Sequence, residues 1–374
     1  MIPYGKQEIN KDDIDAVIKT LKADWITSGP KVDEFEKAIA SYVKADHAIA
    51  VNSGTSALDI AVGALELPKG SEIITTPFTF VATSNCILYN ECKPVFADIN
   101  PKTYNIDTDQ IRKKITKKTK AIIYVDYAGQ PCDIDEIGEI AQENDLKLIE
   151  DAAHAIGAEY KGKRVGSLAD MTEFSFHPVK HITTGEGGMI TTNDEELAKK
   201  LRMLRNHGMD KSLRERLGPT ASYAYDIKML GRNYRITDIQ CALGHSQLKK
   251  LDNILKKRAQ IAVAYGKAFK GMKGVTVPFI NDGIKHAWHL YTILLDEGMD
   301  RDKFFNGMRT RGIGVNVHYI PIYQFSYYKK LKINKNDFPN TNDVFSRIVT
   351  LPLYPGMGER EIDKVVMATK ECLG

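Results

Sequence analysis

The sequence has few cysteines, little net charge and no long apolar run. Its cysteines are odd in number and form no CxxC pair, which favours a reducing compartment and argues against disulfides or a zinc site (Cys86, Cys92, Cys132, Cys241 and Cys372). The 52 basic and 48 acidic residues leave a net charge of only +4, which gives no reason to expect nucleic-acid binding. No stretch approaches the roughly 20 apolar residues of a membrane span, and the first residues have no signal-peptide core. We therefore expect a cytoplasmic protein that binds neither nucleic acid nor membrane.

Several short catalytic motifs are also missing. The chain has no GxGxxG dinucleotide loop, no GxxxxGK(S/T) phosphate loop, no HExxH zinc motif and no GxSxG nucleophile elbow. These absences argue against the commonest nucleotide-binding, metallopeptidase and serine-hydrolase sites. The chemistry must therefore be sought in less regular groups of residues.

Short apolar segments alternate with helical stretches over the first two thirds of the chain. The predicted strands are residues 48–51, 72–75, 94–97, 121–125, 146–149, 173–176 and 188–191. This alternation predicts an α/β fold with a mostly parallel sheet covered by helices on both faces. Before it, residues 10–22 and 32–43 are predicted as amphipathic helices; the first can be capped by Asn10 and has Ile14, Val17, Ile18 and Leu21 as its apolar face.

The pattern changes after about residue 242. A long helical stretch, 236–269, leads into sparser strand signals at 288–295, 315–318 and 349–353. We therefore predict a large domain with an N-terminal helical segment over residues 1–245 and a smaller C-terminal α+β domain over residues 246–374.

Two segments near the start of the sheet could serve a flat, phosphorylated ligand. Thr55 and Ser56 lie where a strand passes into a helix, so they could cradle a phosphate or simply cap that helix. Phe80 follows the next strand and could stack on a ring or pack in the core.

Asp151 and Lys180 are the strongest chemical candidates. Asp151 ends an apolar strand, where open parallel sheets bind ligands, although it could instead cap the next helix. His154 follows three residues later as a structural histidine or a partner of Asp151. Lys180 sits in a loop rich in glycine and threonine, preceded by Ser175. A lysine able to form a Schiff base and an acid able to protonate a ring nitrogen together suggest pyridoxal phosphate (PLP).

Taken in order, these segments resemble the DegT/DnrJ/StrS sugar-nucleotide aminotransferases, which have the aspartate aminotransferase-like fold (PLP-dependent transferase fold type I). The resemblance extends over nearly the whole chain. It is carried by residues 25–29, 52–57, 76–80, 150–154, 174–177, 180, 185–188, 231–235 and 318–321.

The resemblance implies a role for each candidate. Lys180 would be the Schiff-base lysine and the base that moves the proton, and Asp151 would pair with the ring nitrogen. The remaining cofactor contacts would be Phe80 on the ring, His154 near its phenolic oxygen, Thr55, Ser56 and Ser175 at the phosphate, and Asn233 reaching that phosphate from the other subunit of a homodimer.

Finer features resemble the branch that serves pseudaminic acid synthesis. They lie in residues 125–129, 174–188 and 318–324, and they imply substrate contacts from Asp126, Tyr127, His177, His318 and Tyr319. That branch transfers the amino group of L-glutamate to the 4-keto group of a UDP-linked 4-keto-6-deoxy-N-acetylhexosamine. The alternatives are another nucleotide-sugar aminotransferase, of the perosamine or bacillosamine-precursor type, and a non-catalytic PLP-binding relative. A PLP-dependent sugar dehydratase of the same family would carry histidine in place of Lys180.

Overall fold

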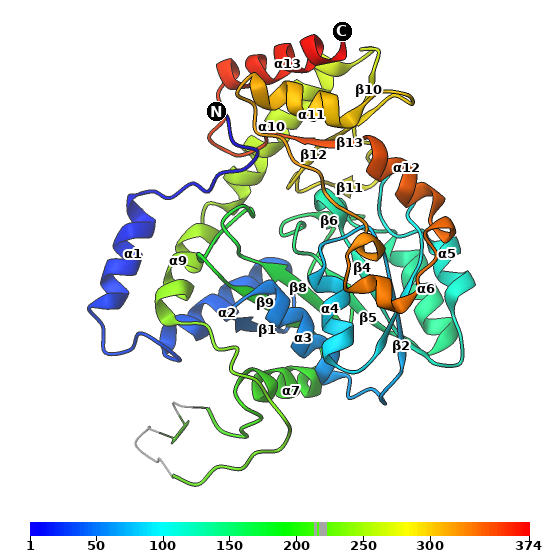
Figure 1. Ribbon diagram of the computed structural model, residues 1–374. Helices are drawn as coiled ribbons and strands as arrows, with labels where there is room; N and C mark the ends of the chain where they lie inside the picture. Colours follow the sequence, from blue (N-terminus) through cyan, green and yellow to red (C-terminus); the bar gives the residue numbers. More distant parts are fainter. Residues whose placement is uncertain (213–214, 217–222) are drawn as a thin grey trace.

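The computed structural model describes residues 1–212, 215–216 and 223–374, and a seven-stranded sheet forms its centre (Figure 1). The strands lie in the order β1 (His47–Val51), β9 (Gly188–Thr192), β8 (Met171–Ser175), β5 (Lys147–Asp151), β4 (Thr119–Val125), β2 (Glu72–Thr75) and β3 (Lys93–Phe96). The pairs from β8 to β3 are parallel, whereas β9 runs antiparallel to β1 and β8. The predicted α/β class and mostly parallel sheet are confirmed.

Successive strand residues point to opposite faces of the sheet, so each strand contributes side chains to an apolar core on each face. Ile149 faces one core and Leu148 the other. The first core is closed by α3 (Gly54–Ala64), α4 (Ala82–Tyr89) and α7 (Glu195–Arg205). The opposite face is closed by α2 (Pro30–Val43), α5 (Thr108–Lys114), α6 (Ile134–Asn144) and α9 (Asp238–Leu248).

A separate C-terminal apolar core lies above the main sheet in Figure 1. Its three-stranded antiparallel sheet has the order β10 (Val275–Thr276), β12 (Tyr291–Leu295) and β13 (Ile348–Leu351), packed with α11 (Arg301–Thr310) and α13 (Glu359–Leu373). The helix α10 (Leu251–Phe269) joins this core to the main sheet: Leu255 is buried in the core beneath α2 and α9, and Tyr265 in the C-terminal core.

The C-terminal part also returns to the main sheet. The short β11 (Ile284–Lys285) pairs with β6 (Glu159–Tyr160), which pairs with β7 (Lys163–Arg164). The turns η2 (Ile322–Gln324), η3 (Tyr328–Leu331) and η4 (Lys335–Asp337) lead into α12 (Pro339–Arg347). Tyr323, Tyr328 and Phe338 pack against Phe96 of β3, and Ile2 pairs with Ile313. The division at residue 245 therefore stays a prediction.

Three local expectations differ from the structure. Asn10 caps α1 (Lys11–Leu21) as predicted, but the predicted apolar stripe is exposed: Ile14 by 51%, Ile18 by 44% and Leu21 by 56%. The helix instead buries Asp13, because Lys250, Ser246 and Gln247 all donate to that carboxylate. The predicted helix 236–269 is two helices, α9 and α10, and residues 315–318 contribute one bridge, from Asn316 to Thr350.

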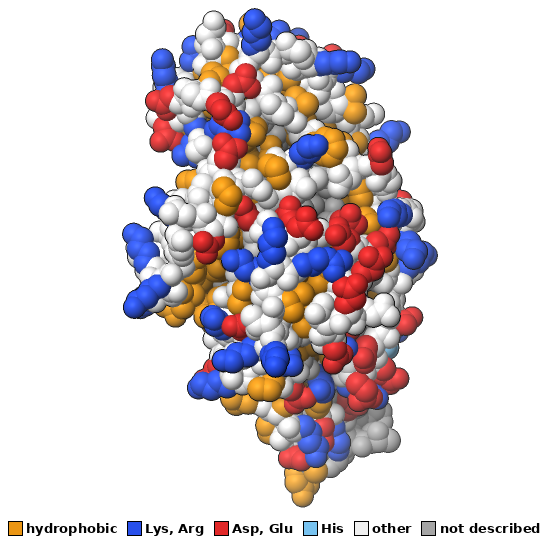
Figure 2. All heavy atoms as spheres, turned by 90° about the vertical axis from the view of Figure 1, so that its right-hand side faces the viewer, with side chains coloured by type: hydrophobic (Ala, Val, Ile, Leu, Met, Phe, Trp, Pro, Cys, Tyr) orange, Lys and Arg blue, Asp and Glu red, His pale blue; other side chains and the backbone are white. Residues whose placement is uncertain are grey.

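The surface carries charges of both signs. Acidic and basic side chains are interspersed on the face shown in Figure 2. Among the helices that the structure describes, none is long and apolar enough to cross a bilayer.

A buried pair of acids lies on the face of the sheet that α6 covers. Asp126 and Glu150 are both fully buried, and the negative charge of Glu150 acts on the Asp126 carboxyl group. Thr172 donates to Glu150 and the Cys132 amide to Asp126. Burial raises the pKa of Glu150 to about 7 and that of Asp126 well above its usual range. The folded protein therefore favours protons on this pair.

This pair predicts a loss of stability as the pH rises from acidic to neutral values. A glutamate titrates near ~4.3 when unfolded, so the contribution is full below that pH and is lost as the pH rises through about 7. Glu150→Gln should reduce the difference in unfolding free energy between pH 5 and pH 8 by on the order of 3 kcal/mol, measured by urea denaturation. The exposed Glu139→Gln on α6 is the control; equal pH dependence in both variants would contradict the prediction.

Candidate functional site

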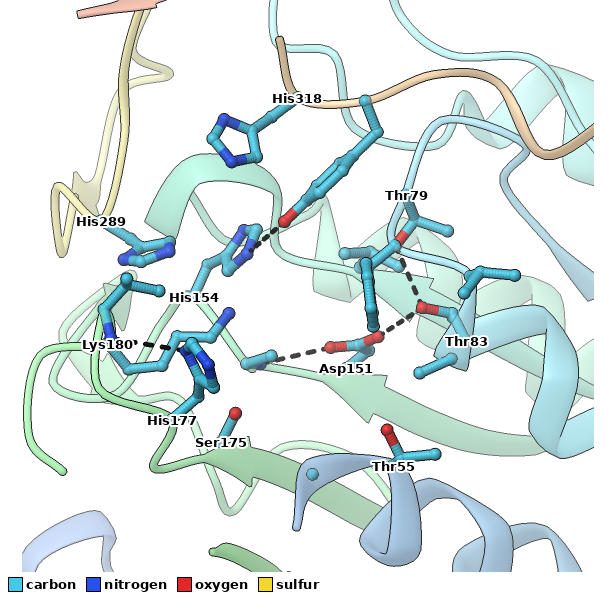
Figure 3. A pocket seen from close by; sticks show the side chains of 18 of the residues that line it. Thr55, Thr79, Thr83, Asp151, His154, Ser175, His177, Lys180, His289 and His318 are labelled. Atoms are coloured by element: carbon cyan, nitrogen blue, oxygen red, sulfur yellow. Dashed lines mark hydrogen bonds between the residues drawn. The ribbon is translucent and has the colours of Figure 1, made fainter. Parts of the chain in front are cut away.

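A cavity of about 500 Å³ opens at the carboxyl ends of β5 and β8. Ligands bind at this edge in open parallel sheets because the loops that leave the strands meet there. Nine of the predicted site residues line it: Thr55, Phe80, Asp151, His154, Ser175, His177, Lys180, His318 and Tyr319. Figure 3 shows Thr55 and Ser175 on one side and His318 on the other, with Lys180 and Asp151 between them.

Asp151 is buried and held by two donors. Thr83 Oγ1 donates to Asp151 Oδ2 at 2.7 Å, and the Ala153 amide donates to Asp151 Oδ1 at 3.2 Å. Thr79 extends the chain with a 3.0 Å bond to Thr83 (Figure 3). Asp151 therefore stabilises the turn that follows it and also presents a fixed carboxylate to the cavity.

Lys180 reaches the cavity from the loop after β8. Its amide donates to the His177 carbonyl oxygen at 2.9 Å, which closes a turn around the lysine. Burial lowers the pKa of the Lys180 ammonium to about 8, and the carboxyl groups of Glu173 and Asp151 oppose that fall. The amine therefore holds and releases a proton near neutral pH.

The start of α3 forms the opposite wall. Ser53 caps this helix by accepting the Ser56 amide at 3.1 Å. Ser56 itself is buried, and its hydroxyl donates to Asn52 Oδ1 at 2.6 Å. Thr55 instead lines the cavity together with Ser175, so the helix N-terminus and two hydroxyl groups face the same space.

Aromatic side chains border the upper part of the cavity. Phe80 is 57% exposed, and its ring lies 6.2 Å from that of Tyr319. The Tyr319 hydroxyl and His154 Nε2 are 2.9 Å apart, and the rings of His154 and His289 lie 4.4 Å apart. Burial, with the charge of Lys180, holds the pKa of His154 well below its usual range, so its imidazole is neutral.

Four predicted residues lie elsewhere. Asp126 and Tyr127 were predicted to contact the substrate, but neither lines the cavity. Asp126 belongs to the buried acid pair, and Tyr127 is 2% exposed and donates to the His318 carbonyl oxygen. Ser56 is occupied in the helix cap. Asn233 is exposed and forms a β-bridge with Asn206. Its predicted contact with the phosphate would be made in the other subunit of a dimer.

Among the cavity residues that were not predicted, Thr83, Glu173 and His289 bear most directly on its chemistry. The sequence could have indicated Glu173, because a glutamate in the middle of a short apolar strand is rarely buried without a partner. Thr83 and His289 come from α4 and from the segment before β12, and only the folded chain brings them together.

The cavity residues fit PLP. Thr55, Ser175 and the start of α3 offer donors that would hold a phosphate, and the Asp151 carboxyl group would pair with a ring nitrogen. The exposed ring of Phe80 can cover one face of a flat ligand. Among the described residues, no cluster of three or more His, Cys, Asp or Glu side chains could hold a metal ion.

Comparison with known sequences identifies one family. The profile of the DegT/DnrJ/EryC1/StrS aminotransferase family matches residues 7–370. Spore coat polysaccharide biosynthesis protein SpsC of Bacillus subtilis is 42% identical, covering 100% of this chain and 97% of SpsC. UDP-4-amino-4,6-dideoxy-N-acetyl-beta-L-altrosamine transaminase of Campylobacter jejuni is also 42% identical, covering 96% of this chain and 94% of that protein.

Solved structures agree in fold over the whole chain. Helicobacter pylori PseC, an aminotransferase involved in the biosynthesis of pseudoaminic acid, superposes with a TM-score of 0.94 at 34% identity, covering 100% of this chain and 99% of PseC. The PLP form of the putative sugar aminotransferase Spr1654 from Streptococcus pneumoniae has a TM-score of 0.93 at 31% identity, covering 100% and 98% of the two chains. The expected aspartate aminotransferase-like fold is thereby confirmed.

The surroundings of Lys180 predict its reactivity. In cofactor-free protein, labelling of Lys180 by a small amine-specific reagent should rise with a midpoint near pH 8. Asp151→Asn should move the midpoint to lower pH, because it removes a negative charge that favours the ammonium form. Mass spectrometry of the labelled peptide measures both, with the exposed Lys19 as internal control. A midpoint that rises in Asp151→Asn would contradict the assigned electrostatics.

Proposed function

The chain belongs to the DegT/DnrJ/EryC1/StrS aminotransferase family, and we propose on that premise that it is a PLP-dependent nucleotide-sugar aminotransferase. The amino group would move from L-glutamate to the 4-keto group of a UDP-linked 4-keto-6-deoxy-N-acetylhexosamine. The product would be UDP-4-amino-4,6-dideoxy-N-acetyl-β-L-altrosamine, a precursor of pseudaminic acid. One observation carries the proposal: a lysine amine and a buried carboxylate face each other across a cavity that begins at a helix N-terminus.

Lys180 would perform the proton transfers. PLP, when bound, supplies an electron sink for the charge left on the carbon that loses its proton. The Lys180 amine, with a pKa of about 8, can accept that proton at Nζ and return it at a neighbouring carbon. The same residue would serve both half-reactions, with the keto sugar as acceptor in the second.

Asp151 would orient and charge the cofactor ring. Two donors fix its carboxylate, so it is aligned before any ligand arrives. Facing a ring nitrogen, it would hold a proton there and thereby stabilise negative charge that develops on the ring. Ser175 and Thr55 would anchor the phosphate at the other end.

The substrate would contact His318 and Tyr319 on one side of the cavity and His177 on the other. His177 is exposed, whereas His318 is buried and fixed by Thr350 Oγ1 at 2.8 Å. These groups can donate to or accept from sugar hydroxyls. We also propose a cytoplasmic homodimer in which Asn233 completes the phosphate site of the other subunit.

A second candidate acceptor is another UDP- or dTDP-linked keto sugar. The relative SpsC, named for spore coat polysaccharide biosynthesis, is as similar to this chain as the altrosamine transaminase. The donor chemistry at Lys180 would be the same for either sugar.

A substrate panel tests the proposed function. PLP-loaded protein should lose its visible absorbance when L-glutamate is added and recover it with a UDP-4-keto-6-deoxy-N-acetylhexosamine, followed by mass spectrometry of the product. The panel should include UDP- and dTDP-linked 4-keto sugars, and Lys180→Ala should abolish both turnover and absorbance. Lys19→Ala is the matched control. Amination of a dTDP sugar alone would favour the second candidate, and no change with glutamate would contradict an aminotransferase.

A mixed dimer tests the shared site. Lys180→Ala and Asn233→Ala should each be inactive or strongly impaired alone, because each dimer then carries two damaged sites. Co-assembled dimers should regain activity at one of their two sites, since one site holds both intact residues. Activity is measured on the purified heterodimer, and a failure to regain it would contradict a contribution of Asn233 across the interface.

A further inference from the structure

Glu173 is a buried acid in the cavity wall that the proposed mechanism does not use. Its side chain is 1% exposed and lines the same cavity as Lys180 and Asp151. Within the described part of the chain, neither of its carboxyl oxygens accepts a hydrogen bond from an N–H or O–H donor. A buried ionised carboxylate without donors is strongly unfavourable, so this group needs either a proton or a ligand.

The partner of Glu173 is Asp151. The two residues are paired in the register of the parallel strands β5 and β8, so their side chains leave the same face of the sheet. Both side chains line the same cavity, and the negative charge of Asp151 acts on the Glu173 carboxyl group. Two carboxylate groups in contact repel each other, and they attract only when one of them carries a proton.

The surroundings decide where that proton lies. Asp151 accepts a hydrogen bond from Thr83 Oγ1 and another from the Ala153 amide, so each of its oxygens already has a donor. Glu173 has no comparable donors in the described residues. Burial, and next the negative charge of Asp151, raise the pKa of Glu173 well above its usual range, although Lys180 opposes this shift. Glu173 is therefore the neutral member of the pair.

Gly54 makes room for this acid. A Cβ atom on Gly54 would lie 2.3 Å from Glu173 Oε1, closer than any van der Waals contact allows. The first residue of α3 thus leaves the space that the Glu173 carboxyl group occupies, between the helix start and Asp151.

We propose that Glu173, as a neutral acid, donates a hydrogen bond to Asp151 and is a positioning residue for the cofactor ring. This inference rests on the proposed function, because it assigns Glu173 a role toward the PLP that Asp151 would hold. Glu173 would be the third donor to Asp151, after Thr83 and the Ala153 amide. Together the three donors would orient the carboxylate, and its remaining acceptor positions would be available to the ring nitrogen. The competing possibility is an ionised Glu173 that pairs with the Lys180 ammonium.

Two substitutions separate these possibilities. Glu173→Gln keeps the length and retains a donor for Asp151, whereas Glu173→Met keeps the approximate length without any donor. If Glu173 is a neutral donor, Glu173→Gln should bind PLP and turn over within about threefold of the wild type. Glu173→Met should lose about ten- to a hundredfold in kcat and bind PLP correspondingly more weakly, as expected for a lost hydrogen bond to a charged group.

An infrared difference spectrum detects the proton directly. The spectrum of PLP-loaded wild type minus that of PLP-loaded Glu173→Gln should contain the C=O stretch of a neutral carboxylic acid. The buried pair of Asp126 and Glu150 is present in both proteins and cancels. This measurement needs no turnover and uses a conservative variant, so it decides the matter even if Glu173→Met fails to fold.

The outcomes are distinct. An acid band together with rescue by glutamine supports the proposal. A carboxylate band, a Glu173→Gln variant as impaired as Glu173→Met, or a Glu173→Met variant equal to wild type would each overturn it. If glutamate and all keto sugars fail to react while the acid band and the loss of PLP affinity in Glu173→Met are observed, the proposed function fails and the pairing of Glu173 with Asp151 stands.

Discussion

The parallel pairing of β5 with β8 is the contact on which the site depends. It sets Asp151 opposite Glu173, and the two-residue repeat of a strand places Ser175 on the same face. The helix α3 packs against that face, so its N-terminus lies beside the same three side chains. A shift of β8 by one residue would turn Glu173 and Ser175 into the opposite core, away from Asp151. The hydrophobic pattern of the two strands, which buries Ile149 and Met171 together, prevents that shift.

Burial then sets the charge states within the cavity. It favours the neutral amine of Lys180 and the neutral imidazole of His154, while two donors hold the Asp151 carboxyl group in place. Electrostatic interactions in such a site are stronger than in water because little solvent screens them.

The sequence allowed prediction of those site residues that end a strand or follow one. Lys180, Asp151 and Ser175 each follow or end an apolar run, and the structure brings all three to one cavity. Asp126 also ends a strand, but it lies one residue beyond the position that pairs with Asp151, so it points to the opposite face. Periodicity identifies strands well, yet it does not tell which face a polar residue at the end will take.

Residues that depend on distant segments were beyond prediction. Thr83 contacts Asp151 only because α4 packs on that face of the sheet, and the apolar stripe predicted for α1 is exposed in the structure. The helix α10 shows what such packing implies for the molecule as a whole. Its first half is part of one core and its second half part of the other. The helix α10 thus connects the two sheets, so local unfolding of either core would also destabilise the other, and the two would unfold cooperatively.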